Sequence, residues 1–125
     1  MEKKRIMIVD DEAGLTRLVR LSLEGTGKYE VREENDAMQA LASALEFRPD
    51  LILLDVVMPD IDGGDVAAQL RKSGPLTQVP IVFLTAIVSR REASTQDDIG
   101  GYPFLSKPVA LDALVKCIED HTAAR

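Results

Sequence analysis

The sequence predicts an α/β fold in which a parallel sheet lies between two layers of helices. Three observations support this fold class. Short apolar runs recur along the 125 residues of the chain, helix-length segments with apolar stripes lie between them, and the two kinds of segment alternate. Strands that are joined by helices pair in parallel, because each helix carries the chain back across the sheet. We expect one domain over residues 1–125.

Five segments are predicted as strands. Residues 6–9, 51–54 and 81–84 are apolar runs that are too short and too continuous for an amphipathic helix. Such runs are typical of strands that are buried on both faces of a parallel sheet. Residues 29–32 and 104–106 carry a weaker signal of the same kind.

Five helices are predicted, one after each strand. The second follows Asp36, a typical N-cap residue. The fourth, near residues 90–99, is polar and poorly patterned, whereas the last has apolar residues at the spacing i, i+3, i+4 and i+7. The first, second, third and last helices have apolar stripes, which contain, in that order, Leu15, Leu18 and Val19; Ala37, Ala40, Leu41, Ala44 and Leu45; Val66 and Leu70; and Leu111, Leu114, Val115 and Ile118.

The overall composition excludes several classes of function. The formal net charge is −6, which disfavours direct binding of nucleic acid through phosphate neutralisation. Cys117 is the single cysteine, so an internal disulfide is excluded and a reducing compartment is favoured. No apolar run is long enough to span a bilayer or to form a signal peptide, so we expect a cytoplasmic protein that does not enter the membrane.

Polar side chains follow four of the five predicted strands. The carboxyl ends of parallel strands meet at one edge of the sheet, which is where such folds bind their ligands. We therefore expect these side chains to lie close together. They are Asp10, Asp11 and Glu12 after the first strand, Asp55 after the third, Thr85 after the fourth and Lys107 after the fifth.

Taken singly, each of these residues has an ordinary structural interpretation as a turn former, helix cap, strand end or solvated charge. Taken together, they predict phosphoryl chemistry. Clustered carboxylates repel one another, and a hard divalent cation such as Mg²⁺, or Mn²⁺ as a substitute, removes that repulsion. Lys107 and Thr85 supply a positive charge and a hydroxyl donor for a phosphate. Asp55 is a candidate nucleophile that would form an aspartyl-phosphate.

Four ordered motifs resemble the receiver domain of two-component response regulators. They are IMIVDDE (6–12), PDLILLDVVMPDIDGG (49–64), VPIVFLTA (79–86) and FLSKP (104–108), and they span nearly the whole chain. The resemblance implies a doubly wound, flavodoxin-like (βα)5 sandwich of three layers. It also implies a five-stranded parallel sheet with the strand order 2-1-3-4-5.

The resemblance also assigns roles at the metal site. Asp55 corresponds to the phosphoacceptor and metal ligand. Asp11 corresponds to a direct Mg²⁺ ligand, and Asp10 to a residue that acts mainly through metal-bound water. The backbone carbonyl of Val57 corresponds to a further ligand.

Three further residues match the phosphoryl contacts and the switch of the family. Thr85 and Lys107 correspond to the residues that contact the phosphoryl group, and Phe104 occupies the switch-aromatic position. The peptide bond between Lys107 and Pro108 is expected to be cis. The chain departs from the family at Tyr102 and Pro103, where small or acidic residues are usual, so the signalling face is unusual.

The implied partners are a sensor histidine kinase or a histidine phosphotransfer protein, which would phosphorylate Asp55. A downstream effector domain or protein would then recognise the face built from the fourth helix, the fifth strand and the fifth helix. Homodimerisation through the same face is left open. The domain would catalyse its own phosphorylation and dephosphorylation without being a turnover enzyme.

Two alternatives belong to other functional classes. A Mg²⁺-dependent phosphohydrolase also uses an aspartyl nucleophile, but it expects Asp-x-Asp at the strand end, and here Val57 stands at the second position. A receiver-like interaction module that signals without phosphorylation needs none of the site residues, all of which are present.

Overall fold

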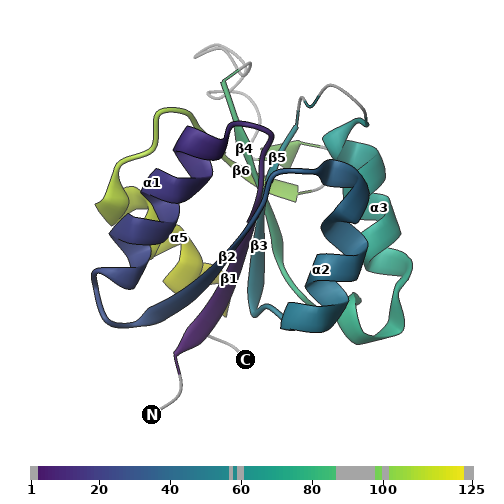
Figure 1. Cartoon of the computed structure of the whole chain (residues 1–125), viewed down its shortest axis with the longest axis horizontal. Coiled ribbons are helices and arrows are strands. Elements are labelled where there is room, and N and C mark those ends of the chain that lie inside the picture. The colour runs from purple at the N-terminus through teal and green to yellow at the C-terminus, as the bar shows by residue number, and fades with distance from the viewer. Residues whose placement is uncertain (1–2, 57, 59–60, 87–97, 100–101, 123–125) are drawn as a thin grey trace.

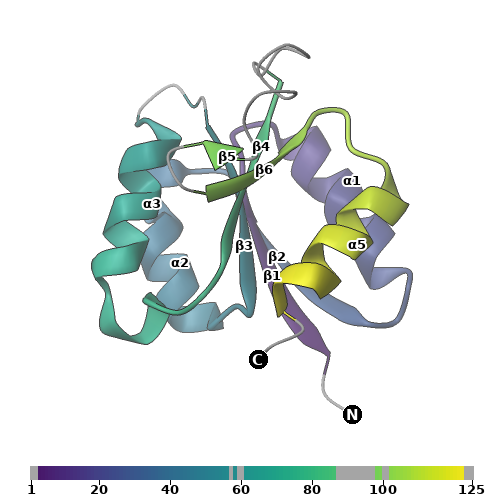
Figure 2. The ribbon, with the colours of Figure 1, turned by 180° about the vertical axis from the view of Figure 1, so that it is seen from behind.

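A computed structural model describes residues 3–56, 58, 61–86, 98–99 and 102–122. Within these residues a central sheet separates two pairs of helices, α1 with α5 and α2 with α3 (Figure 1). The reverse view shows the same three layers (Figure 2). This arrangement is the α/β sandwich that the alternation of strands and helices predicts.

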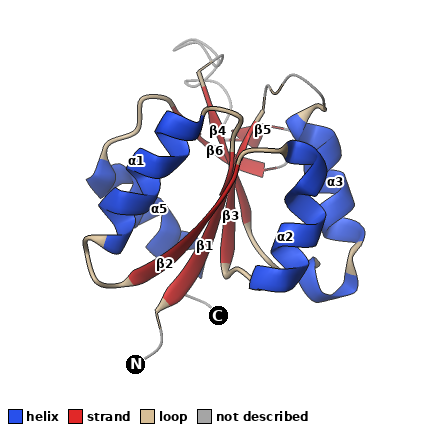
Figure 3. Cartoon of the chain, viewed as in Figure 1, coloured by secondary structure: helices blue, strands red, loops and turns tan. Residues whose placement is uncertain are grey.

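The sheet of the described chain has six strands in the order β2-β1-β3-β4-β6-β5 (Figure 3). The first five strands of that order pair in parallel, which confirms the predicted order of five. The short strand β5 is an addition that pairs antiparallel with β6. The strands are β1 (Lys4–Val9), β2 (Tyr29–Glu34), β3 (Leu51–Asp55), β4 (Ile81–Thr85), β5 (Asp98–Ile99) and β6 (Tyr102–Ser106).

The described residues form four α-helices and two 3₁₀ helices, of which α5 follows the last strand. The predicted second helix begins with a 3₁₀ turn, and the Asp36 side chain caps that turn by accepting the Met38 N–H. The helices are α1 (Ala13–Glu24), η1 (Ala37–Gln39), α2 (Ala40–Phe47), α3 (Gly63–Lys72), η2 (Gly74–Leu76) and α5 (Leu111–Thr122).

The predicted fourth helix is wrong at its C-terminal end. The fourth helix was expected near residues 90–99, but Asp98 and Ile99 form β5 instead. Their backbone pairs with Pro103 and Tyr102 of β6, and a helix would forfeit that pairing. The remainder of the predicted helix, residues 90–97, lies outside the described residues.

The sheet divides the apolar interior into two cores because successive strand residues point to opposite faces. On β3, Leu51 and Leu53 join the core under α1 and α5, whereas Ile52 and Leu54 join the core under α2 and α3. All four side chains are fully buried. Both faces of the central strands are therefore covered, as their continuous apolar sequences predict. Among the described residues, no helix has the length and apolar character needed to cross a membrane.

Candidate functional site

Three carboxylates meet at the carboxyl edge of the sheet. Asp55 is the last residue of β3, and Asp10 follows β1, the neighbouring strand. Val9 stands opposite Leu54 in the register of these strands, which brings the two aspartates level with each other. Asp10, Asp11 and Asp55 each offer a carboxylate oxygen, and these oxygens lie within 4.8 Å of one another.

The three aspartates differ in their exposure to solvent. Asp10 is fully buried and Asp55 is 6% exposed, whereas Asp11 is exposed. Buried carboxylates need a cationic partner or hydrogen-bond donors, because desolvation disfavours the charged form. Asp10 receives one such bond from the backbone N–H of Glu12, which lies 3.0 Å from Asp10 Oδ1.

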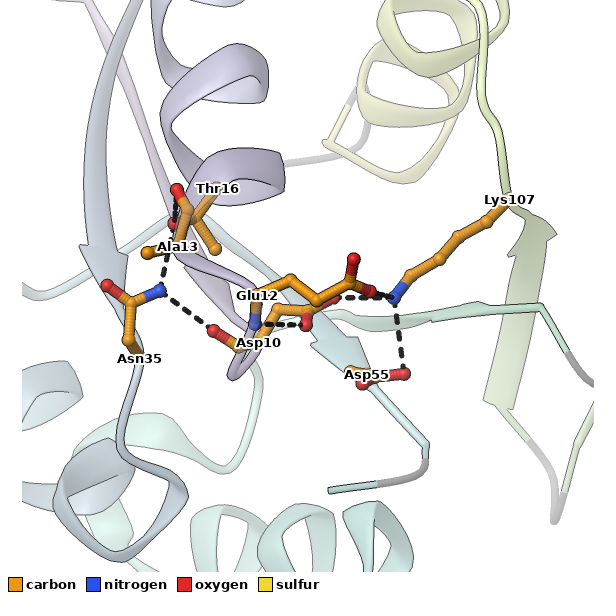
Figure 4. A network of polar contacts seen from close by, with 7 residues as sticks. All are labelled: Asp10, Glu12, Ala13, Thr16, Asn35, Asp55 and Lys107. Atoms are coloured by element: carbon orange, nitrogen blue, oxygen red, sulfur yellow. Dashed lines mark hydrogen bonds and ion pairs between the residues drawn. The ribbon is translucent and has the colours of Figure 1, made fainter. Parts of the chain in front are cut away.

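Lys107 supplies the positive charge among these acids (Figure 4). Its Nζ atom lies 2.7 Å from Asp10 Oδ2, 3.2 Å from Glu12 Oε1 and 3.6 Å from Asp55 Oδ1. Burial lowers the pKa of the Lys107 ammonium, but its carboxylate neighbours raise it by more, so the pKa lies above its ordinary value. The lysine is thus charged at neutral pH. The Lys107–Pro108 peptide bond is cis.

Thr85 lies at the same edge of the sheet, at the end of the next strand. It ends β4, next to β3, and is 1% exposed. Its carbonyl oxygen accepts a hydrogen bond of 2.9 Å from the Lys107 N–H, which links β4 to the lysine loop. The structure thus gathers Asp10, Asp11, Asp55 and Lys107 around one point, with Thr85 at the end of the adjoining strand.

The turn after Asp55 is held by close backbone packing. The Gly63 N–H donates to the Val56 carbonyl oxygen at 2.9 Å, and Asp62 caps α3 by accepting the Gly64 N–H. A Cβ atom on Gly63 would collide with the Asp55 carbonyl oxygen and would lie 2.8 Å from Val56 Cα. Glycine at position 63 is therefore required by the approach of α3 to the end of β3.

The aromatic residues of β6 pack beside β4. Phe104 stands opposite Phe83 in the strand register and is partly buried against the core under α2 and α3. The Tyr102 ring meets Phe83 edge to face at 5.4 Å, and Arg71 of α3 lies 5.4 Å from the centre of the Tyr102 ring. Tyr102 is thus a packing residue between β4 and α3.

Sequence reasoning missed two features of the site. Glu12 was grouped with the acids but given no role, although it pairs with Lys107. Asn35 was not considered, although its side-chain amide donates a hydrogen bond of 2.8 Å to the Asp10 carbonyl oxygen. The predicted strand 29–32 ends before Asn35, whereas β2 continues to Glu34, so the local pattern held no signal for Asn35. Val57, the expected source of a backbone ligand, lies outside the described residues.

The donor set suits a hard metal ion. Three carboxylate oxygens within 4.8 Å of one another match the oxygen-rich ligands of Mg²⁺ and Mn²⁺ and lack the nitrogen and sulfur ligands that zinc prefers. The Lys107 ammonium balances only part of the acidic charge around it. The cluster is therefore able to hold a divalent cation.

The amino-acid sequence matches a family model and curated relatives. A family model described as the response regulator receiver domain matches residues 6–119. The chain is 40% identical to the response regulator MprA of Mycobacterium leprae and 32% identical to the DNA-binding dual master transcriptional regulator RpaA of Synechocystis sp.. Both similarities extend over 111 residues and 89% of this chain. The chain spans about half the length of these relatives, 47% and 46% respectively.

Solved structures show the same architecture. The chemotaxis protein CheY4 of Vibrio cholerae superposes with a TM-score of 0.82 at 28% identity, over 95% of this chain and 98% of that one. A CheY-like response regulator receiver domain protein of Methanospirillum hungatei gives a TM-score of 0.82 at 26% identity, over 98% and 96% of the two chains. The sequence match over most of the chain and the shared fold lead to one conclusion: the chain belongs to the response regulator receiver domain family.

Proposed function

We propose that Asp55 accepts a phosphoryl group from a phosphohistidine of a sensor kinase or a histidine phosphotransfer protein. The observation that carries this proposal is the convergence of a nearly buried carboxylate, two further acids and one ammonium at a single sheet edge. Asp55 is still 8% exposed at its side chain, so a donor can approach it. The proposed receiver domain covers residues 1–125.

The reaction is a displacement at phosphorus. A carboxylate oxygen of Asp55 attacks, the phosphorus–nitrogen bond to the donor histidine breaks, and the imidazole leaves with a proton taken from solvent. A Mg²⁺ ion held by Asp10, Asp11 and Asp55, with the Val57 carbonyl as a further ligand, would neutralise negative charge on the phosphoryl oxygens.

Lys107 and Thr85 act on the same phosphoryl group. The Lys107 ammonium leaves its resting carboxylate partners and pairs with a phosphoryl oxygen, and the Thr85 hydroxyl donates to another. The domain thereby catalyses its own phosphorylation, and hydrolysis of the acyl phosphate by water releases inorganic phosphate and restores the Asp55 carboxylate. Each phosphoryl transfer changes the state of the domain, so the chain is a switch and not a turnover enzyme.

The output follows from movement at Thr85 and Phe104. Phe104 lies beside β4, two residues before the end of β6, so a shift of Thr85 frees space for its ring. The signalling face would include β6, α5 and the segment between β4 and β5, and a downstream effector domain or protein would read it. Homodimerisation is a further use of this face. We propose a cytoplasmic location, as expected of response regulators, and no direct binding of nucleic acid by this segment.

The test is phosphorylation by a small acyl phosphate in the presence of Mg²⁺, followed by intact mass spectrometry. We expect one added phosphate that disappears with EDTA and in Asp55→Asn. Continuous release of inorganic phosphate without a phosphorylated protein would support a phosphohydrolase instead. A chain that remains unmodified, and that still binds its partner, would support an interaction module that works without phosphorylation.

A further inference from the structure

A polar network joins the end of β2 to the loop that carries Asp10 and Asp11 (Figure 4). The Nδ2 atom of Asn35 lies 2.8 Å from the Asp10 carbonyl oxygen and 2.9 Å from Thr16 Oγ1. The carbonyl oxygen can only accept, so the orientation of the Asn35 amide is fixed and both of its hydrogens are used. Asp10 precedes α1 and Thr16 lies inside it. The Asn35 side chain therefore links the β1–α1 loop to the first turns of α1.

Thr16 is in turn oriented by an anchored carboxylate. Its side chain is fully buried, and its Oγ1 lies 2.8 Å from Glu33 Oε1 and 3.1 Å from the Ala13 carbonyl oxygen. Because its oxygen receives the Asn35 hydrogen bond, the single Thr16 hydrogen goes to the nearer, charged Glu33. Arg20 donates to the other Glu33 oxygen at 3.0 Å. Asn35 therefore donates to Thr16, and Thr16 in turn donates to Glu33.

These bonds restrict Asp10 on every side except one. The Asp10 N–H donates to the Glu34 carbonyl oxygen at 3.1 Å, its carbonyl oxygen accepts from Asn35, and its Oδ1 accepts from the Glu12 N–H at 3.0 Å. Its other carboxylate oxygen, Oδ2, lies 2.7 Å from Lys107 Nζ. The carboxylate is thus aimed into the site before any cation arrives.

This preorganisation opposes a repulsive force. Asp10, Asp11 and Asp55 hold like charges within 4.8 Å, so a loose β1–α1 loop would swing Asp10 and Asp11 away from Asp55. Building on the proposed function, we propose that Asn35 and Thr16 are positioning residues for the metal-binding loop. They hold Asp10 and Asp11 close to Asp55 and thereby raise the affinity for Mg²⁺, without contacting the metal or the phosphoryl group.

The test uses Asn35→Ala and Thr16→Val, in the whole chain. Asn35 is exposed, so its truncation leaves the core intact, and valine keeps the shape of threonine without its hydroxyl. We expect each variant to weaken Mg²⁺ binding about tenfold, the lower end of what outer-shell ligand partners contribute. Isothermal titration with MgCl₂ measures the affinity. The maximal phosphorylation rate at saturating Mg²⁺ should stay within about threefold of wild type, because the metal then holds the loop itself.

Two matched variants separate positioning from general stability. Thr16→Ser retains the hydroxyl and should restore Mg²⁺ affinity to within about twofold of wild type. Tyr29→Phe removes a hydrogen bond at the opposite edge of the sheet, where Tyr29 Oη lies 2.6 Å from Glu119 Oε2, and should leave Mg²⁺ affinity unchanged. Melting curves in EDTA establish that each variant is folded.

The outcomes are distinguishable. Unchanged Mg²⁺ affinity in Asn35→Ala, or an equal loss in Tyr29→Phe, would overturn the positioning role and leave the proposed function intact. A loss in Asn35→Ala with normal affinity in Thr16→Ser supports it. A wild-type chain that binds no Mg²⁺ would remove the proposed function together with this inference.

Discussion

At the residue scale, Gly63 sets how closely α3 approaches the end of β3. A methyl group there would meet the Asp55 carbonyl oxygen, and backbone cannot give way as a flexible side chain can. Gly63→Ala should therefore lower the free energy of unfolding by about 2–3 kcal/mol, as overpacking does. It should also slow phosphorylation, because the end of β3 must shift. Urea denaturation and the rate of acyl phosphate labelling measure the two effects.

Gly14→Ala is the matched control for Gly63→Ala. Gly14 lies in α1, and a Cβ atom there meets nothing within 4 Å. Alanine favours helix over glycine by up to about 1 kcal/mol, so this variant should be as stable as wild type or more stable. A Gly63→Ala variant that matched Gly14→Ala in both stability and labelling rate would show that the close approach is unimportant.

We expect Lys107 to compete with Mg²⁺ for the carboxylates of Asp10 and Asp55. Its ammonium lies 2.7 Å from Asp10 Oδ2 and 3.6 Å from Asp55 Oδ1. Lys107→Ala removes this competing charge and should tighten Mg²⁺ binding by about threefold or more. The same change should abolish most phosphoryl transfer if Lys107 contacts the phosphoryl group, as proposed above. Calorimetric titration with MgCl₂ measures the Mg²⁺ affinity, and labelling at saturating Mg²⁺ measures the phosphoryl transfer. Weaker Mg²⁺ binding in Lys107→Ala would contradict the competition.

At the element scale, a polar cluster at the opposite edge of the sheet ties α5 to two strands. The Tyr29 hydroxyl of β2 donates to Glu119 Oε2 at 2.6 Å, and Lys4 of β1 lies 3.0 Å from Glu119 Oε1. Burial, and then the bond to Glu119, raises the pKa of Tyr29. The hydrogen bonds from Tyr29 and Lys4 lower the pKa of Glu119 below its ordinary 4.5.

The lowered pKa of Glu119 predicts that the stability of the fold depends on pH. A lowered pKa in the folded state stabilises the fold above the ordinary pKa, and this contribution disappears as pH falls through the folded value. Tyr29→Phe should cost about 1–2 kcal/mol of unfolding free energy at pH 7, and the cost should shrink as the pH falls below the ordinary pKa of glutamate. Chemical denaturation at several pH values measures it. Tyr102→Phe, which keeps the ring contacts, is the control, and a cost for Tyr29→Phe that does not vary with pH would contradict the role of Glu119.

The sequence predicts the elements well where the apolar pattern is strong. Leu53 and Leu54 belong to a run that is buried on both faces, and that pattern has no competing interpretation. A helix is predicted at Asp98 and Ile99 because a helix-length segment separates two predicted strands there, and pairing with β6 depends on contacts that no local pattern encodes.

The same contrast holds at the site. The convergence of Asp10, Asp55 and Lys107 follows from parallel strands that end at one edge, so it was predictable. The Asn35 bonds to Asp10 and Thr16 were not, because they depend on how far the end of β2 lies from α1. A polar residue after a strand reads equally well as a turn former.

At the scale of the whole molecule, we expect the acidic cluster of Asp10, Asp11 and Asp55 to couple the stability of the fold to Mg²⁺ binding. Asp11 is exposed, so Asp11→Asn removes a charge without disturbing the core. In EDTA the variant should melt above wild type, because less repulsion remains. Mg²⁺ at 100 times its Kd should stabilise wild type by about 2.7 kcal/mol, or about 10 °C, and Asp11→Asn by clearly less. Differential scanning calorimetry measures both, and equal Mg²⁺ responses would count against Asp11 as a ligand.

The Tyr102 ring, which packs edge to face against Phe83, can serve as an intrinsic fluorescent probe of β4. The protein has no tryptophan and two tyrosines, so Tyr29→Phe leaves Tyr102 as the sole source of tyrosine fluorescence. Phe83 lies on the strand that ends at Thr85, and the emission of that one ring would therefore follow any rearrangement of the strand without an added dye.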